Sequence, residues 1–138
     1  MKTQAQKIVD KMYENDAFSQ WLGIEILEVR TGYAKIKMTT RAEMVNGFGI
    51  VHGGISFSFA DSAFAFACNS PGRHSVSIDT SISHLKKIGV GETIFAEAKE
   101  ENLSHKIGLY RIEVTNEKGE LVALFKGTNY RSSQEWNV

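Results

Sequence analysis

The chain has 138 residues, and its 16 basic and 16 acidic side chains cancel in charge. With 42% hydrophobic and 23% charged residues, it has the composition of an ordinary globular protein. The length suits one domain with a substantial core, so we expect a single domain over residues 1–138. The neutral charge balance gives no reason to expect DNA, RNA or an anionic membrane as a partner.

The N-terminal residues do not have the pattern of a signal peptide, because they lead into a mixed-charge helix instead of an apolar segment. No stretch is apolar enough over a sufficient length to span a bilayer, since Asp61 interrupts the best candidate. The one cysteine, Cys68, rules out an internal disulfide and is interpreted as a core residue. These features predict a cytoplasmic protein with no membrane partner.

In chain order, the first predicted element is a helix over residues 3–15, where Ile8, Val9 and Met12 share one face. A short second helix is expected over residues 18–22. From Gly23 the hydrophobic period changes to two, which predicts strands over residues 24–29 and 33–38.

Residues 54–68 consist mostly of phenylalanine and alanine and predict a helix about 22 Å long. Because this segment is apolar on nearly all sides, we expect it to be buried at the centre of the fold. A cluster of turn residues at 69–72 should end it. Four more strands are then expected, at residues 75–85, 93–101, 108–115 and 121–130. The residues from Ser132 onward are expected to be frayed, with docking of Trp136 as the alternative.

Only a sheet is available to cover the central helix, and short connections favour antiparallel neighbours. The sequence therefore predicts an α+β fold in which a mostly antiparallel sheet of about six strands wraps a long central helix. The helix has more apolar surface than one sheet face can cover. We therefore expect a second subunit to cover part of it.

Asp61 is the one charged residue within this helix. A buried charge is costly unless it is paired or hydrogen-bonded, so we interpret Asp61 as a catalytic base or nucleophile. The alternative is a buried acid that accepts a hydrogen bond from a neighbouring hydroxyl. Apolar surroundings would raise the pKa of Asp61 and hydrogen bonds would lower it, so the sequence leaves the direction open.

His52, Gly53 and Gly54 stand at the start of the helix. The first backbone N–H groups of a helix have no intrahelical partner, and with the helix dipole they favour an oxygen that gains negative charge. Glycine also lets a substrate approach the backbone closely. The alternative interpretation of these three residues is a tight turn into the helix.

Asn46, the H-G-G sequence at 52–54 and Asp61, together with A-C-N-S at 67–70, closely resemble the hot-dog-fold acyl-CoA thioesterases. The resemblance is closest to their phenylacetate-pathway (PaaI-like) branch and continues through V-A-L-F-K-G at 122–127. It implies the hot-dog fold and hydrolysis of acyl-CoA thioesters to a free acid and coenzyme A. The implied acyl group is aryl-acetyl, such as hydroxyphenylacetyl, or of medium chain length.

The resemblance gives Gly53 the role of oxyanion donor, and Asp61 either activates a water or attacks directly. Eight residues along one helix span about 12 Å, so Gly53 and Asp61 of one chain cannot both reach one carbonyl group. If both act, Asp61 must serve the Gly53 of another subunit, which a two-fold dimer provides twice. The resemblance implies the same shared site, and a homotetramer built from two such homodimers.

Three further residues are candidates for the catalytic site. Asn46 would hold the loop or the attacking water, and His52 would orient the thioester or anchor the turn. Ser77 matches a strand position where several relatives carry a hydroxyl near the acid, so it would position water. The alternative for Ser77 is an ordinary strand serine, with Thr80 and Ser81 as weaker candidates for its role.

Coenzyme A carries phosphates, so basic residues are candidates for binding it; otherwise they are solvated surface residues. With Gly54, the candidate substrate and coenzyme A contacts are Lys86, Lys87, Lys106 and Arg111. The sequence His84-Leu85-Lys86-Lys87 departs from the aromatic-leucine-arginine-proline pattern of the relatives. This departure leaves the nucleotide contacts and the pocket shape undefined.

We expect neither a metal nor a redox cofactor, because the four histidines lack an i,i+4 spacing and one cysteine makes a zinc site unfavourable. One alternative function is a non-catalytic acyl-CoA-binding protein, but such a protein would lose the acid at position 61. Another is a hydratase or dehydratase, which needs an acid–base pair. Asp61 and His52 are the only residues placed to form one.

Overall fold

The computed structural model describes all 138 residues of the chain. Its helices are α1 (Gln4–Glu14), α2 (Ala17–Leu22), the 3-10 helix η1 (Ala42–Met44) and α3 (Gly53–Asn69). Its strands are β1 (Glu25–Arg30), β2 (Tyr33–Thr39), β3 (Arg73–His84), β4 (Thr93–Leu103), β5 (Ile107–Thr115) and β6 (Leu121–Glu135). The order and type of the predicted elements are confirmed, and α3 extends one residue beyond each end of the predicted central helix.

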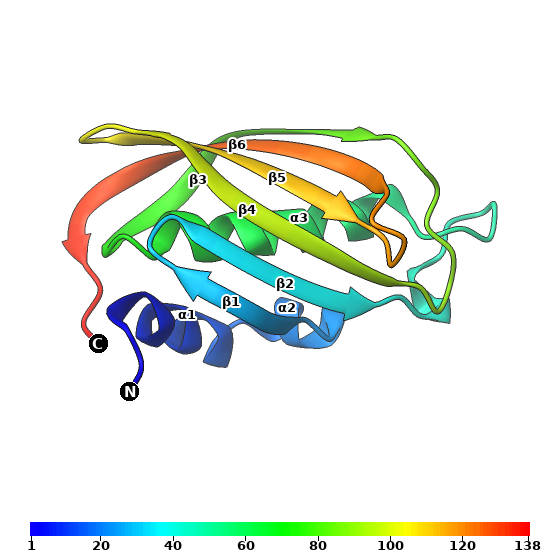
Figure 1. Cartoon of the computed structure of the whole chain (residues 1–138), viewed down its shortest axis with the longest axis horizontal. Coiled ribbons are helices and arrows are strands. Elements are labelled where there is room, and N and C mark those ends of the chain that lie inside the picture. Colours follow the sequence, from blue (N-terminus) through cyan, green and yellow to red (C-terminus); the bar gives the residue numbers. More distant parts are fainter.

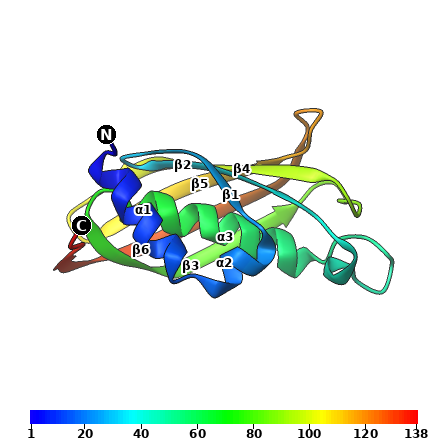
Figure 2. The same ribbon diagram turned by 90° about the horizontal axis from the view of Figure 1, so that it is seen from below.

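All six strands form one antiparallel sheet with the order β1-β2-β4-β5-β6-β3. The sheet curves around α3, while α1 and α2 lie along α3 on the side away from the sheet (Figures 1 and 2). This arrangement confirms the predicted fold, a central helix wrapped by an antiparallel sheet. No helix combines the length and apolar composition that crossing a membrane requires.

The core lies between α3 and the inner face of the sheet. Phe59, Phe64 and Phe66 of α3 are fully buried there. A Cβ atom on Gly127 of β6 would lie only 2.7 Å from ring carbons of Phe64, so residue 127 must be glycine for that ring to reach the sheet. Gly127, which ends the V-A-L-F-K-G sequence, therefore allows the ring of Phe64 to pack against β6.

Strand β3 lies at one edge of the sheet and pairs only with β6. A register shift between Ser77 and Asp79 interrupts its alternation. Strict alternation would place Val76, Ile78, Thr80 and Ile82 on one face, but the first two are exposed and the last two half-buried. Val76 and Ile78 are 64% and 57% exposed on this strand. A long unpaired edge with exposed apolar side chains is typical of a surface that pairs with another chain.

The C-terminal segment is ordered, and the prediction that it frays from Ser132 is wrong. Strand β6 continues to Glu135, and the indole Nε1 of Trp136 donates a hydrogen bond of 3.0 Å to Oδ1 of Asn69. The Trp136 ring also stacks on His74 with a centroid distance of 4.0 Å. The backbone N–H of Trp136 donates a second hydrogen bond, of 2.8 Å, to the carbonyl of Gly72. These contacts fix the segment against the end of α3.

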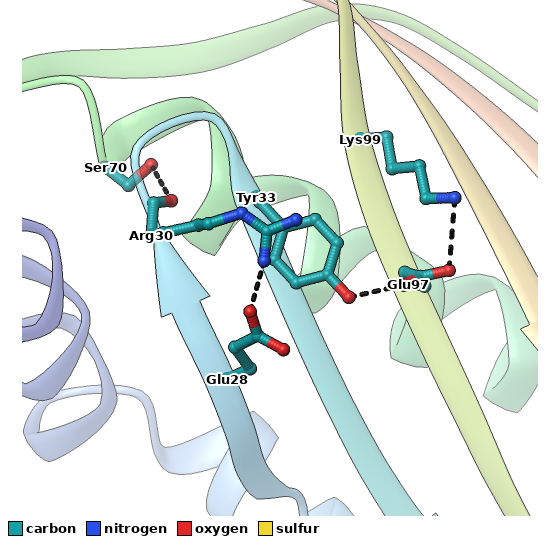
Figure 3. Close-up of polar contacts among 6 residues, drawn as sticks. All are labelled: Glu28, Arg30, Tyr33, Ser70, Glu97 and Lys99. Carbon is teal, nitrogen blue, oxygen red and sulfur yellow. Dashed lines mark hydrogen bonds and ion pairs between the residues drawn. The ribbon is translucent and has the colours of Figure 1, made fainter.

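A chain of polar contacts joins β1, β2 and β4 near the same end of α3 (Figure 3). The guanidinium of Arg30 lies 3.6 Å from the ring centroid of Tyr33, whose hydroxyl donates to Glu97. Burial and this carboxylate raise the pKa of Tyr33 to about 12. Ser70 donates a hydrogen bond of 3.2 Å to the carbonyl of Arg30, so this residue of the A-C-N-S sequence ties α3 to the β1–β2 hairpin.

Candidate active site

The start of α3 presents one N–H group without a partner inside the chain. His52 is the N-cap residue, and its Nδ1 accepts a hydrogen bond of 2.8 Å from the N–H of Gly54. The N–H of Gly53 donates no hydrogen bond within the chain. His52 thus anchors the turn and occupies the N–H of Gly54, while the N–H of Gly53 stays available to a substrate oxygen.

Asn46 holds the loop that leads into α3. Its Oδ1 accepts hydrogen bonds of 2.9 Å from the N–H of Phe48 and 3.4 Å from the N–H of Ile50. The backbone N–H of Asn46 donates to the carbonyl of Ile50 at 2.8 Å. Asn46 was expected to hold either the loop or the attacking water. These hydrogen bonds show that it holds the loop.

A cavity of about 290 Å³ opens beside Gly53. Four residues predicted for substrate binding or catalysis share this cavity. Its polar and glycine lining consists of Asn46, Gly53, Ser56, His84, Lys86 and Lys87. Lys86 is exposed and pairs with Glu120 at 2.6 Å, whereas Lys87 forms no ion pair within the chain. The cavity therefore combines an N–H donor with two cationic side chains.

Asp61 lies in the middle of α3, half-buried, and faces α2. It lines a second cavity of about 180 Å³ together with Asp16, Phe18 and Phe57. Burial and, secondly, the charge of Asp16 raise the pKa of the Asp61 carboxyl above its ordinary value. The adjacent hydroxyl of Ser62 bonds to Ser19 at 2.8 Å, so it does not stabilise Asp61. Within one chain no hydroxyl donates to Asp61, so the structure does not show the alternative of an acid held by a neighbouring hydroxyl.

Gly53 and Asp61 line different cavities, and about 12 Å of helix separates them. No single thioester carbonyl can contact both groups within one chain.

Three predicted residues lie away from both cavities. Ser77 is exposed on the edge strand β3. Lys106 lies in the turn between β4 and β5, at the opposite end of the sheet from the start of α3 (Figure 1). Arg111 is on β5, with its guanidinium 3.9 Å from the carboxylate of Glu113. Within one chain, these residues do not meet Asp61 or the N–H of Gly53.

Sequence reasoning missed three neighbours of the candidate residues. Phe18 and Asp16 reach the cavity of Asp61 because α2 packs beside α3 (Figure 2), and no pattern in the sequence indicated that contact. The ring of His84 lies against Gly53, where a Cβ atom would be 3.2 Å from its Nε2. The one signal in the sequence for His84 was its position two residues before Lys86, a predicted coenzyme A contact.

The structure contains no group of three His, Cys, Asp or Glu side chains arranged to bind a metal ion.

Comparison with known proteins gives a consistent result. The family model described as "Thioesterase superfamily" matches residues 48–123. The Escherichia coli acyl-coenzyme A thioesterase PaaI is 40% identical over 131 residues, which cover 95% of this chain and 94% of that protein. The structure of E. coli PaaI, from the phenylacetic acid degradation operon, matches with a TM-score of 0.93 and 39% identity over 96% of both chains.

A mutant structure of the phenylacetic acid degradation protein PaaI from Thermus thermophilus matches with a TM-score of 0.82 and 38% identity. That match covers 85% of this chain and 100% of the other. The same fold, 40% identity to PaaI over most of both chains and a family model over more than half of the residues lead to one conclusion: the chain is an enzyme domain of the hot-dog thioesterase superfamily.

Proposed function

We propose that this protein hydrolyses acyl-CoA thioesters to a free acid and coenzyme A. The observation that best supports this function is the unpartnered N–H of Gly53 at the start of a 17-residue helix, opening onto a cavity with two lysines. That N–H and the dipole of α3 would stabilise the negative charge that develops on a thioester carbonyl under attack. Lys86 and Lys87 would attract the phosphates of coenzyme A.

Asp61 would accept a proton from the attacking water. Its raised pKa makes the carboxylate a stronger base than an ordinary aspartate, and no hydrogen bond within the chain satisfies it. Direct attack by the carboxylate on the carbonyl carbon is the second route. Hydrolysis in ¹⁸O-labelled water under single-turnover conditions distinguishes the two: the proposed route puts the label in the product acid, whereas direct attack leaves it in Asp61.

The site would be shared between two subunits, because Gly53 and Asp61 of one chain are too far apart to act on one carbonyl. A homodimer related by a two-fold axis brings each Asp61 to the other chain's Gly53. The unpaired edge of β3, with Val76 and Ile78 exposed, supports such a dimer. Two dimers would form a homotetramer, as the family resemblance implies.

The acyl group would be aromatic. Phe18 and Phe57 line the cavity that contains Asp61, and ring faces and edges of this kind suit an aryl-acetyl group. Two similar structures belong to proteins of phenylacetic acid degradation. We therefore place hydroxyphenylacetyl-CoA and related thioesters first among the substrates, and medium-chain acyl-CoA second.

Thiol release from a panel of acetyl-, hexanoyl-, phenylacetyl- and hydroxyphenylacetyl-CoA tests this function. We expect turnover that is highest with the aryl-acetyl thioesters and that falls on the order of 10²-fold or more in Asp61→Asn. Asp10→Asn, at an exposed acid of α1 paired with Lys2, is the matched control and should keep wild-type activity. Binding without turnover would favour the non-catalytic alternative, and hydration of enoyl-CoA would favour the hydratase.

A further inference from the structure

His84 is the last residue of β3 and lies beside the first turn of α3. Its Nδ1 is 3.3 Å from the hydroxyl oxygen of Ser56. Its Nε2 is close to Gly53: a Cβ atom added to that glycine would lie 3.2 Å from Nε2. The ring is exposed and lines the same cavity as Gly53. A ring nitrogen of His84 therefore stands next to the proposed oxyanion donor.

The order of the groups in an acyl-CoA thioester indicates which of them His84 would contact. The carbonyl oxygen belongs at the N–H of Gly53, and the phosphates of coenzyme A belong near Lys86 and Lys87. In a thioester the sulfur is bonded to the carbonyl carbon on the side of coenzyme A. The sulfur would therefore lie between Gly53 and the lysines, in the cavity that His84 also lines.

The contact with Ser56 bears on the position of the ring proton. The one hydroxyl proton of Ser56 has two acceptors within reach, the carbonyl oxygen of Gly53 at 3.1 Å and Nδ1 of His84 at 3.3 Å. The proposed role uses the tautomer in which Ser56 donates to Nδ1. A neutral imidazole that accepts at Nδ1 carries its proton on Nε2. Nε2–H is then a hydrogen-bond donor that faces the cavity.

We propose that His84 stabilises the departing sulfur of coenzyme A through this Nε2–H group; the inference rests on the proposed function. Asp61 of the facing subunit takes a proton from water, whose oxygen bonds to the carbonyl carbon. When the tetrahedral intermediate collapses, the carbon–sulfur bond breaks and its electron pair goes to sulfur. The thiolate accepts a hydrogen bond from Nε2–H and is then protonated by the proton that Asp61 received. This hydrolysis needs no oxidant, reductant or metal.

Paired thioesters with the same acyl group test this role. One is the pantetheine thioester, whose alkyl thiolate is basic; the other is the thioester of 5-thio-2-nitrobenzoate, whose aryl thiolate is weakly basic and leaves without help. For His84→Phe, which keeps a ring and removes the donor, we expect kcat to fall roughly 10- to 100-fold with the pantetheine thioester. With the aryl thioester we expect little or no loss.

His84→Gln restores an N–H donor and should recover part of the activity on the pantetheine thioester. His105→Phe, at an exposed histidine in the β4–β5 turn, is the matched control and should equal wild type on both substrates. Equal losses with the two leaving groups, or no loss with either, would overturn the role of His84. A wild-type protein that hydrolyses neither thioester would overturn the proposed function, and the role of His84 with it.

Discussion

The ring of His84 lies against Gly53, so that a Cβ atom on residue 53 would come within 3.2 Å of Nε2. The nearest obstacle to a side chain at this position is therefore a flexible, exposed ring and not the backbone. Alanine at position 53 should be accommodated by a small shift of that ring, at little cost in stability. The added methyl group would, however, occupy the space through which a carbonyl oxygen approaches the N–H.

Gly53→Ala should lower kcat on the order of 10²-fold, the cost of losing one oxyanion donor, while the melting temperature stays close to wild type. Thiol release and thermal unfolding measure the two effects. Gly47→Ala is the matched control, because position 47 lies in the preceding loop and a Cβ atom there meets nothing within 4 Å. Full activity of Gly53→Ala would show that this N–H does not bind the oxyanion.

Asp61→Asn should stabilise the protein at neutral pH. Burial and the charge of Asp16 raise the pKa of Asp61 in the folded state, so the folded state binds this proton more tightly than the unfolded state does. The contribution of this proton to the stability of wild type is lost as the pH rises through the folded-state pKa of Asp61. Asparagine does not titrate, so the stability of the variant does not change in this way. The melting temperature of the variant should exceed that of wild type by a few degrees at pH 8.

Below the ordinary aspartate value of 3.8 both side chains are neutral, and the difference should vanish. Thermal unfolding from pH 3 to pH 8 measures this trend, with Asp10→Asn as the exposed control. A variant less stable than wild type at pH 8 would mean that the Asp61 carboxylate is paired in the assembled protein.

Ile78→Lys should disrupt the dimer and thiol release together. Ile78 is 57% exposed on the edge strand β3, and a lysine at its place would put two like charges near a two-fold axis. Light scattering after size exclusion would show a smaller species, and activity should fall at least tenfold because each site needs two subunits. Leu27→Lys is the matched control, since Leu27 is 46% exposed on β1 at the other edge of the sheet.

Gly127→Ala should destabilise the fold without touching the site. The new Cβ atom would lie 2.7 Å from the ring of Phe64, which is fully buried and cannot move away. Overpacking of this kind costs about 1–3 kcal/mol. Urea unfolding would report the loss, and the double variant Gly127→Ala with Phe64→Leu should regain part of the stability. An unchanged midpoint for Gly127→Ala would contradict the packing described here.

Much of the fold was predictable because its parts are strongly periodic. The phenylalanine-rich segment predicted α3 to within one residue at each end, and alternation predicted all six strands. The C-terminal segment was mispredicted because its order depends on contacts of Trp136 with Asn69 and His74, more than 60 residues away in the sequence. The bulge in β3 was also missed, since alternation alone cannot show where one residue is left unpaired.

In the candidate site, too, the residues with local contacts were predictable and those with long-range contacts were not. The positions of Gly53 and Asn46 were predictable because they depend on local backbone geometry in the loop before the helix and at its first residue. His84 and Phe18 were not, because their proximity to Gly53 and Asp61 arises from packing between distant elements. Arg111 was chosen by its charge, and Lys106 by its charge and by the family resemblance, and neither criterion places a residue on the sheet.

Complementation between two inactive variants tests the shared site most directly. Asp61→Asn chains and Gly53→Ala chains, co-expressed in equal amounts and purified as one population, form mixed dimers with one intact site made of Gly53 from one chain and Asp61 from the other. Random pairing makes half of the dimers mixed with one of two sites intact, so thiol release should return to about one quarter of the wild-type rate. Activity no higher than that of either variant alone would contradict a site divided between two subunits.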